Sequence, residues 1–284
     1  MTYLRPNSLA EALDLLAKAP CRILAGGTDL YPATTRSSLT GPILDITAIA
    51  ELSALRDERD CWRLGATMRW TDVIRADLPA AFDGLKLAAR EVGAQQIQNQ
   101  GTLAGNLCNA SPAADGVPPL LTLDAQVELA SVAGVRQLPL LSFITGVRQT
   151  ALRQDEMVTA VLVPKASAEG RSSFLKLGAR KYLVISIAMV AVRLAVKDER
   201  LIEVALAIGS CSAVARRLPA LEQQLLGATT EAACQRLDDQ AVAAQLAPID
   251  DIRGSAAYRS RAAAELLRRC LRAAADPQEE ERAA

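Results

Sequence analysis

Histidine is absent from the 284 residues of the chain. This absence excludes Ser-His and Cys-His nucleophiles, metal sites ligated by His, and a flavin tethered through His. It also removes the commonest general acid and base of enzymes. We therefore expect any chemistry at this chain to come from a bound cofactor, and we predict no catalytic side chain.

Excess charge of either sign is also missing, as are long apolar runs. The chain has 32 basic and 32 acidic residues, only 3% aromatics, and no Lys/Arg cluster interleaved with aromatics. Nucleic acid is therefore not an expected partner. No run reaches the roughly 18 apolar residues of a membrane span, and the first residues do not resemble a secretion signal. We expect a cytoplasmic protein.

Paired cysteines are missing too. The six cysteines are widely scattered, and no CxxC or similar spacing could hold zinc or an iron–sulfur cluster. We interpret them as buried thiols in a reducing compartment, with Cys108 the one that most resembles a ligand. No metal site is predicted in this chain.

Apolar residues, by contrast, are abundant: they make up half of the sequence, which is enough for a substantial core. Up to Pro164 the pattern alternates between short strands and helices. A helix over 8–18 is predicted from the Ser8–Glu11 capping box and its helical periodicity. "RILAGGTDL" predicts a strand, a glycine turn and a helix start at Thr28 or Asp29. Further strands are expected in 42–46, 61–67, 125–131 and 157–164, and further helical pieces in 71–93 and 113–121.

From Ser172 the pattern changes to longer β-branched strands, at 172–180, 185–196 and 201–210, which we expect to form an antiparallel meander. Helices are predicted near 215–226, 230–245 and 254–275. Strands followed by helices indicate a separate α+β domain. The linker is placed at 165–170, and 277–284 is expected to be a solvated tail.

The segment "AGGTDL", residues 25–30, is the first candidate site, here called the glycine turn. Glycines allow positive φ and let a ligand approach backbone N–H groups, which can cradle phosphate oxygens without a cationic side chain. The alternative is a plain strand-to-helix turn. The segment matches neither GxGxxG nor a P-loop, because its glycines are adjacent and no Lys follows.

The second candidate is "GTLAGNLCNASPAAD", residues 101–115, here called the asparagine segment. Its side chains offer hydroxyl, amide and carboxylate groups but no positive charge. Neutral donors suit a ligand whose charge is met by backbone amides, and an Asp suits a sugar hydroxyl. The alternative is an Asx-rich loop that satisfies its own backbone.

Together the two candidates resemble a known family. "AGGTDL" followed by "GAQQIQNQGTLAGNLCNASPAAD" resembles the FAD-binding medium subunit of the molybdenum hydroxylases, the xanthine dehydrogenase and carbon monoxide dehydrogenase family. "LRQDEMVTAVLVP", "FLKLGARKYLVISIAMVAV" and "DIRGSAAYRSRAAAELLRRCL" are similar to later elements of that family in the same order. The resemblance extends over essentially the whole chain.

The resemblance implies an α+β fold. A two-lobed FAD-binding domain of the PCMH/vanillyl-alcohol-oxidase type would cover 1–165, with lobes of about 1–55 and 56–165. A C-terminal domain with a three-stranded antiparallel sheet and a helix bundle would cover 170–276. Non-covalent FAD would take electrons from 2Fe–2S clusters of a small partner subunit and pass them to NAD+ or another acceptor. A large partner subunit would hold molybdopterin.

The resemblance also implies site residues. Residues Ile23, Leu24, Ala25, Gly26, Gly27, Thr28, Asp29 and Leu30 would wrap the FAD diphosphate. The other side of the cofactor would meet Gly101, Thr102, Gly105, Asn106, Asn109 and Asp115. Val158 would give a backbone contact to the adenine or flavin edge, and Lys176 would lie near the isoalloxazine. Ser111 is interpreted as structural.

Two other functions remain open on the sequence. A stand-alone flavin oxidoreductase of the vanillyl-alcohol-oxidase type would need its own substrate pocket with a proton donor, and no such donor is evident. A non-catalytic assembly subunit could keep the fold and lose FAD. Cys108 is not expected to ligate a cluster, because "NLC" continues directly into "NASPAAD" without a cysteine-rich insertion.

Overall fold

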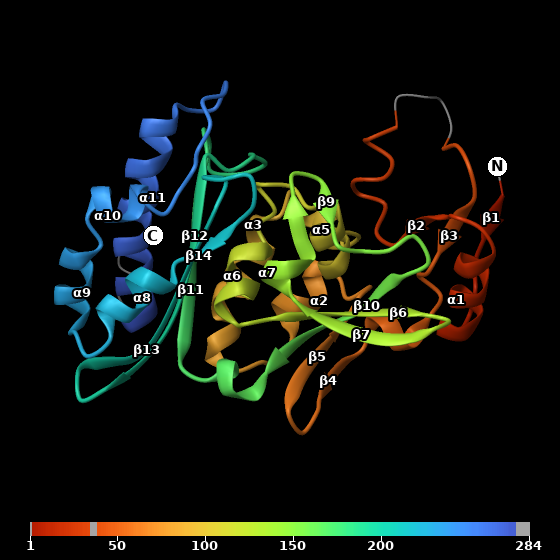
Figure 1. Cartoon of the computed structure of the whole chain (residues 1–284), viewed down its shortest axis with the longest axis horizontal. Coiled ribbons are helices and arrows are strands. Elements are labelled where there is room, and N and C mark those ends of the chain that lie inside the picture. The colour runs from red at the N-terminus through yellow and green to blue at the C-terminus, as the bar shows by residue number, and fades with distance from the viewer. Residues whose placement is uncertain (1, 35–38, 277–284) are drawn as a thin grey trace.

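The computed structural model describes residues 2–34 and 39–276, so the predicted tail at 277–284 lies outside the described residues. In the part of the chain that the structure describes, three larger sheets follow one another along the molecule, with the helices packed around them, and a two-stranded sheet is added to the second (Figure 1). Among the described residues, no helix combines the length and the low polarity needed to cross a membrane.

The N-terminal lobe is a parallel three-stranded sheet with one helix. The strands, in spatial order, are β1 (Tyr3–Leu4), β3 (Ile43–Asp45) and β2 (Arg22–Leu24). The helix α1 (Leu9–Lys18) begins as predicted, because the Ser8 hydroxyl accepts a hydrogen bond from the Glu11 N–H at 3.3 Å. A 3₁₀ turn, η1 (Ala50–Ser53), leads to the next lobe.

The second lobe is built on a five-stranded antiparallel sheet. Its strands, in spatial order, are β4 (Leu55–Asp57), β5 (Cys61–Gly65), β10 (Met157–Pro164), β6 (Gln126–Ser131) and β7 (Gly134–Pro139). The helices are α2 (Trp70–Arg75), η2 (Ala80–Phe82), α3 (Asp83–Glu91), α4 (Gln95–Gln98), α5 (Leu103–Asn109), α6 (Val117–Thr122) and α7 (Leu140–Phe143). The hairpin of β8 (Ile144–Gly146) and β9 (Gln149–Thr150) completes the lobe, and η3 (Lys165–Ala168) occupies the predicted linker.

The C-terminal part is a four-stranded antiparallel sheet of β11 (Arg171–Leu177), β12 (Ala188–Lys197), β13 (Arg200–Gly209) and β14 (Arg216–Arg217). The first three strands form the predicted meander; the two-residue β14 is a fourth strand that the sequence pattern did not reveal. The helices α8 (Pro219–Leu225), α9 (Thr230–Arg236), α10 (Asp239–Ala243) and α11 (Ala256–Ala275) lie on one face of this sheet, and α3 and α6 lie on the other (Figure 1).

Several predicted elements differ from the structure. The helix predicted near 215–226 is the strand β14 followed by the helix α8, which starts at Pro219. No helix begins at Thr28 or Asp29; residues 28–33 form consecutive turns. The single helix expected over 230–245 is two helices, because the Asp238 carboxylate accepts a hydrogen bond from the Ala241 N–H at 2.8 Å and starts α10. The helix predicted at 113–121 is the shorter α6, which starts at Val117 ahead of two prolines.

Candidate functional site

The glycine turn leaves β2 with its backbone amides unused. Gly27 has φ +71°, the left-handed conformation that glycine adopts without strain. Within 2–34 and 39–276, no N–H of Gly26, Gly27, Thr28, Asp29 or Leu30 donates a hydrogen bond to the protein. Five consecutive amides without a protein partner leave hydrogen-bond donors that an anion can use.

The glycine turn and the asparagine segment approach each other at Gly26. A Cβ built on Gly26 would lie 2.7 Å from the carbonyl carbon of Gln100, and its oxygen would be closer still. The same Cβ would lie 2.9 Å from the Cα of Gly101. Only glycine fits this crossing, so the pairing of the two segments predicted from the sequence is a direct backbone contact.

A second contact joins the two segments through side chains. The Asn109 amide donates a hydrogen bond to the Asp29 carboxylate at 2.7 Å. Arg148 also reaches Asn109: its guanidinium donates to the backbone oxygen at 3.2 Å and to the side-chain oxygen. The asparagine segment contains no Lys or Arg, but the turn between β8 and β9 places the Arg148 guanidinium beside it.

Arg148 was not found by sequence reasoning. It lies in a short hairpin turn with φ +57°, and its N–H donates to the Ala110 oxygen at the end of α5, at 2.9 Å. A single arginine after "ITGV" gives no local signal of this placement, because the contact joins residues about forty positions apart in the chain.

Much of the asparagine segment is the helix α5. The Thr102 hydroxyl accepts a hydrogen bond from the Gly105 N–H at 3.1 Å and so caps this helix. Trp70 is fully buried beneath it, and its N–H donates to the Gly101 oxygen at 3.1 Å. A Cβ on Gly116 would lie 2.5 Å from the Trp70 ring, so the indole packs directly against the end of the asparagine segment. The sequence did not single out Trp70.

Asn106 carries an unsatisfied atom in this region. Its side-chain oxygen is buried and has no hydrogen-bond partner among the described residues. Leaving a buried acceptor unpaired costs about 1–3 kcal/mol, so a donor from water or from a bound ligand would stabilise this atom. Ser111 keeps a local role, because its hydroxyl accepts from the Ala113 N–H at 3.2 Å.

Cys108 was expected to be buried, and this was wrong: its side chain is exposed. It follows buried Leu107 on α5, and the next position on a helix points about 100° away, here toward solvent. Among the residues that the structure describes, no group of three or more His, Cys, Asp or Glu side chains is placed to hold a metal ion.

Asp115, predicted to line one side of the cofactor, and Lys176, predicted near the isoalloxazine, form a buried ion pair at 2.8 Å. The Asp115 carboxylate also accepts from the Ser186 hydroxyl at 3.1 Å, and the Lys176 ammonium donates to the Glu91 oxygen at 3.3 Å. Burial raises the pKa of the Asp115 carboxyl, and the ammonium of Lys176 opposes that rise. The pair joins the asparagine segment to β11 of the C-terminal sheet.

The remaining predicted residues pack into the cores of the first two lobes. Ile23 and Ala25 pack against the buried cluster that contains Met157, the first residue of β10. The next residue, Val158, is buried in the core of the second lobe at an irregularity in the pairing of β10 with β6. Leu24 and Leu30 pack together in a small cluster with Ile43.

A separate apolar pocket of about 240 Å³ lies between α6, α7 and residues 214–217. None of the predicted site residues lines it.

Comparison with known proteins defines the class of this chain. The family model described as the FAD-binding domain in molybdopterin dehydrogenase matches residues 1–166, and the CO dehydrogenase flavoprotein C-terminal domain matches residues 173–274. The chain belongs to the family of FAD-binding medium subunits of molybdenum hydroxylases, the flavoprotein subunits of xanthine dehydrogenase-like oxidoreductases.

Individual relatives agree with this membership. The chain is 31% identical over 273 residues to the nicotine 6-hydroxylase medium subunit of Paenarthrobacter nicotinovorans, covering 95% of each chain. It is 38% identical over 197 residues to the nicotinate dehydrogenase FAD-subunit of Eubacterium barkeri, covering 65% of each chain. The carbon monoxide dehydrogenase structure from Hydrogenophaga pseudoflava superposes with a TM-score of 0.88, at 29% identity and 96% coverage of both chains.

Proposed function

We propose that this chain is the FAD-carrying electron-transfer subunit of a molybdenum hydroxylase complex. In this proposal it accepts electrons from 2Fe–2S clusters of a small partner subunit and passes them to NAD+ or another acceptor. A large partner subunit holds molybdopterin and the substrate. The observation that carries the proposal is the row of five unpaired amides at Gly26–Leu30, facing no acceptor within the described chain.

The residues present fit the cofactor. The unpaired amides of the glycine turn match a diphosphate, which needs donors and no protein cation. The unpartnered oxygen of Asn106 matches a hydroxyl of the ribose or ribityl chain. The proposed contacts are the sixteen positions from Ile23 to Lys176 given by the sequence, with residues 1–165 as the FAD-binding domain and 170–276 as the C-terminal domain.

Bound FAD supplies the redox chemistry of the subunit. The chain's own contribution is to bind and orient it: amides 26–30 hold the diphosphate, and the close approach at Gly26 sets the distance between the two segments. Asp115 and Lys176 form the wall toward the C-terminal sheet. We place the subunit in the cytoplasm, since its six cysteines show none of the paired spacing of disulfide or cluster sites.

The test is to purify the chain together with the proteins that the adjacent genes encode, and to measure flavin, molybdenum and iron in the same preparation. The proposal predicts a flavin absorbance spectrum, with molybdenum and iron co-purifying with this chain. Flavin without either metal would favour the stand-alone oxidoreductase. Both metals without flavin would favour the assembly subunit.

A further inference from the structure

The short helix α6 is held at both ends by the C-terminal sheet. Its six residues are all buried, and it follows the asparagine segment after Gly116. At its N-terminal end, Asp115 is paired with Lys176 of β11. At its C-terminal end, its last carbonyl groups point at two arginines of the same sheet, one on β12 and one on β14.

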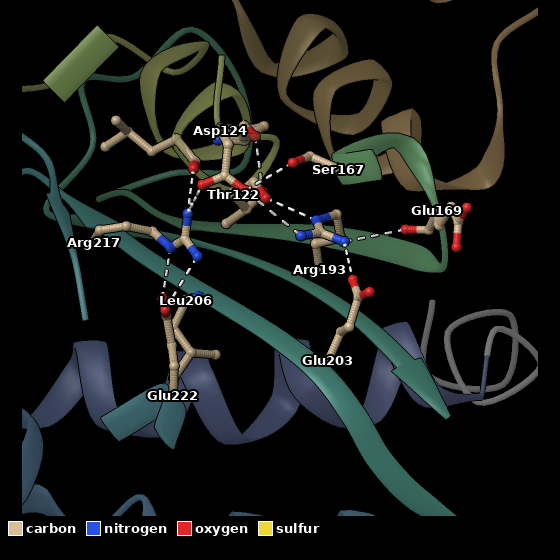
Figure 2. A network of polar contacts seen from close by, with 11 residues as sticks. Thr122, Asp124, Ser167, Glu169, Arg193, Glu203, Leu206, Arg217 and Glu222 are labelled. Carbon is tan, nitrogen blue, oxygen red and sulfur yellow. Dashed lines mark hydrogen bonds and ion pairs between the residues drawn. The ribbon is translucent and has the colours of Figure 1, made fainter. Parts of the chain in front are cut away.

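These two arginines form what we call the arginine clamp, Arg193 and Arg217 (Figure 2). The Arg193 Nε donates to the Thr122 oxygen at 2.8 Å. The Arg217 Nη1 donates to the Leu121 oxygen at 2.8 Å. Guanidinium groups at a helix C-terminus satisfy carbonyl groups that lack an intrahelical partner and complement the helix dipole.

The clamp is itself held in place. Figure 2 shows Asp124 between the two guanidinium groups: it lies 2.6 Å from Arg217 and 3.8 Å from Arg193. Glu222 binds Arg217 through both carboxylate oxygens, at 2.6 and 3.1 Å, and also accepts from the Leu206 N–H. Arg193 is 5% exposed and also pairs with Glu203 at 2.9 Å.

The same sheet also contacts the asparagine segment directly. The Ser210 N–H, just after β13, donates to the Pro112 oxygen at 2.9 Å. The segment and α6 are therefore tied to the C-terminal sheet at Pro112, at Asp115 and at the clamp. Two prolines at the start of α6 fix φ at two of its six positions, so the helix that links Asp115 to the clamp has little backbone freedom.

We propose that Arg193 and Arg217 are positioning residues of the FAD site: by anchoring α6 to the C-terminal sheet, they keep the asparagine segment ordered for the cofactor. This inference rests on the proposed function. Without the clamp, the asparagine segment is less ordered in the flavin-free chain, and part of the free energy of FAD binding is used to order it. FAD affinity therefore falls although no FAD contact is lost.

The test uses Arg193→Lys and Arg217→Lys in the full chain. Lysine keeps the charge, but its single nitrogen cannot replace a guanidinium that bonds a carbonyl group and carboxylates at once. The matched control is Arg200→Lys, because Arg200 of β13 donates to the Gly227 oxygen at 2.7 Å, within the C-terminal part. Two quantities are measured: amide hydrogen exchange of residues 101–115 in the flavin-free chain, and FAD affinity.

We expect exchange at 101–115 to be roughly tenfold faster in both clamp variants, and FAD affinity to be roughly three- to thirty-fold weaker. Exchange in α11 and both quantities in the control should match the unaltered chain. Unchanged exchange at 101–115 would overturn the proposal, as would equal acceleration in α11. Failure of the unaltered chain to bind FAD would instead overturn the proposed function, while exchange would still decide whether the clamp orders the segment.

Discussion

At Gly26, the missing side chain allows two segments that are distant in the sequence to lie directly against each other. Its neighbours Gln100 and Gly101 come so close that a methyl group at position 26 would overlap their backbone. The surrounding amides stay unpaired because the chain turns there without forming a helix. Both segments stand out in the sequence, since glycine and asparagine act through local backbone chemistry.

Gly26→Ala should therefore lower FAD affinity. Forcing the crossing apart costs about 3 kcal/mol, which corresponds to roughly a hundredfold in affinity. Flavin fluorescence during titration of the flavin-free variant measures the change. The control is Gly146→Ala, where an added Cβ would meet the flexible end of Gln149 at 3.1 Å. Equal affinity of the two variants would show that the crossing does not shape the site.

Asp115 and Lys176 illustrate what local sequence reasoning misses. Each was predicted as a cofactor contact, yet their ion pair joins the asparagine segment to β11 of the C-terminal sheet, across 61 positions. Nothing near "AAD" or "FLKLG" encodes it. Arg148 and Trp70 were missed for the same reason, because their importance arises from packing between elements far apart in the sequence.

Breaking this buried ion pair should destabilise the flavin-free chain. Asp115→Asn leaves the Lys176 ammonium, 5% exposed, without its counter-charge, at a cost of about 3 kcal/mol in the free energy of unfolding. Asp115→Asn with Lys176→Met should lose less than the two single changes added together. Asp57→Asn, in an exposed pair with Lys165, is the control and should cost below about 1 kcal/mol. Additive urea-unfolding energies would contradict the pairing.

At the scale of elements, strands with strong alternation or continuous apolar character were predicted well: β5, β6, β10 and the three long strands of the C-terminal sheet. The missed strands are short or polar. β7 is an edge strand with exposed Val135, and β14 has two arginines. Such strands are specified by their neighbours rather than by their own pattern.

An ion pair links the edge strand β7 to the residue that precedes β10, and it predicts that the free energy of unfolding depends on pH. Arg136 binds Glu156 at 2.6 Å, and this hydrogen bond is the main reason why the pKa of the buried Glu156 carboxyl lies below its usual value. Between the two pKa values the unfolded chain binds more protons, so stability falls as pH drops from about 4.5 through the folded-state pKa.

Glu156→Gln should remove this contribution. The difference in unfolding free energy between the unaltered chain and the variant should be largest above about pH 4.5 and should shrink on acidification. Urea unfolding at a series of pH values measures it, with exposed Glu199→Gln as the control. A difference that stays constant with pH would show that the Arg136 bond does not set this titration.

For the whole molecule, the C-terminal sheet is packed against helices on both faces, and α3 and α6 on one face belong to the second lobe (Figure 1). The cofactor site proposed here thus depends on the glycine turn of the first lobe, the asparagine segment of the second, and a wall from the C-terminal sheet. Family membership rests on matches to residues 1–166 and 173–274, which together include all three parts.

The most direct test of the proposed FAD site is an FAD titration of the purified, flavin-free chain, monitored by flavin fluorescence and by hydrogen exchange of residues 25–30. We expect saturable binding of one FAD per chain, with amides 26–30 becoming protected on binding. A folded chain that binds no FAD, or that binds it without protecting these amides, would contradict the proposed site.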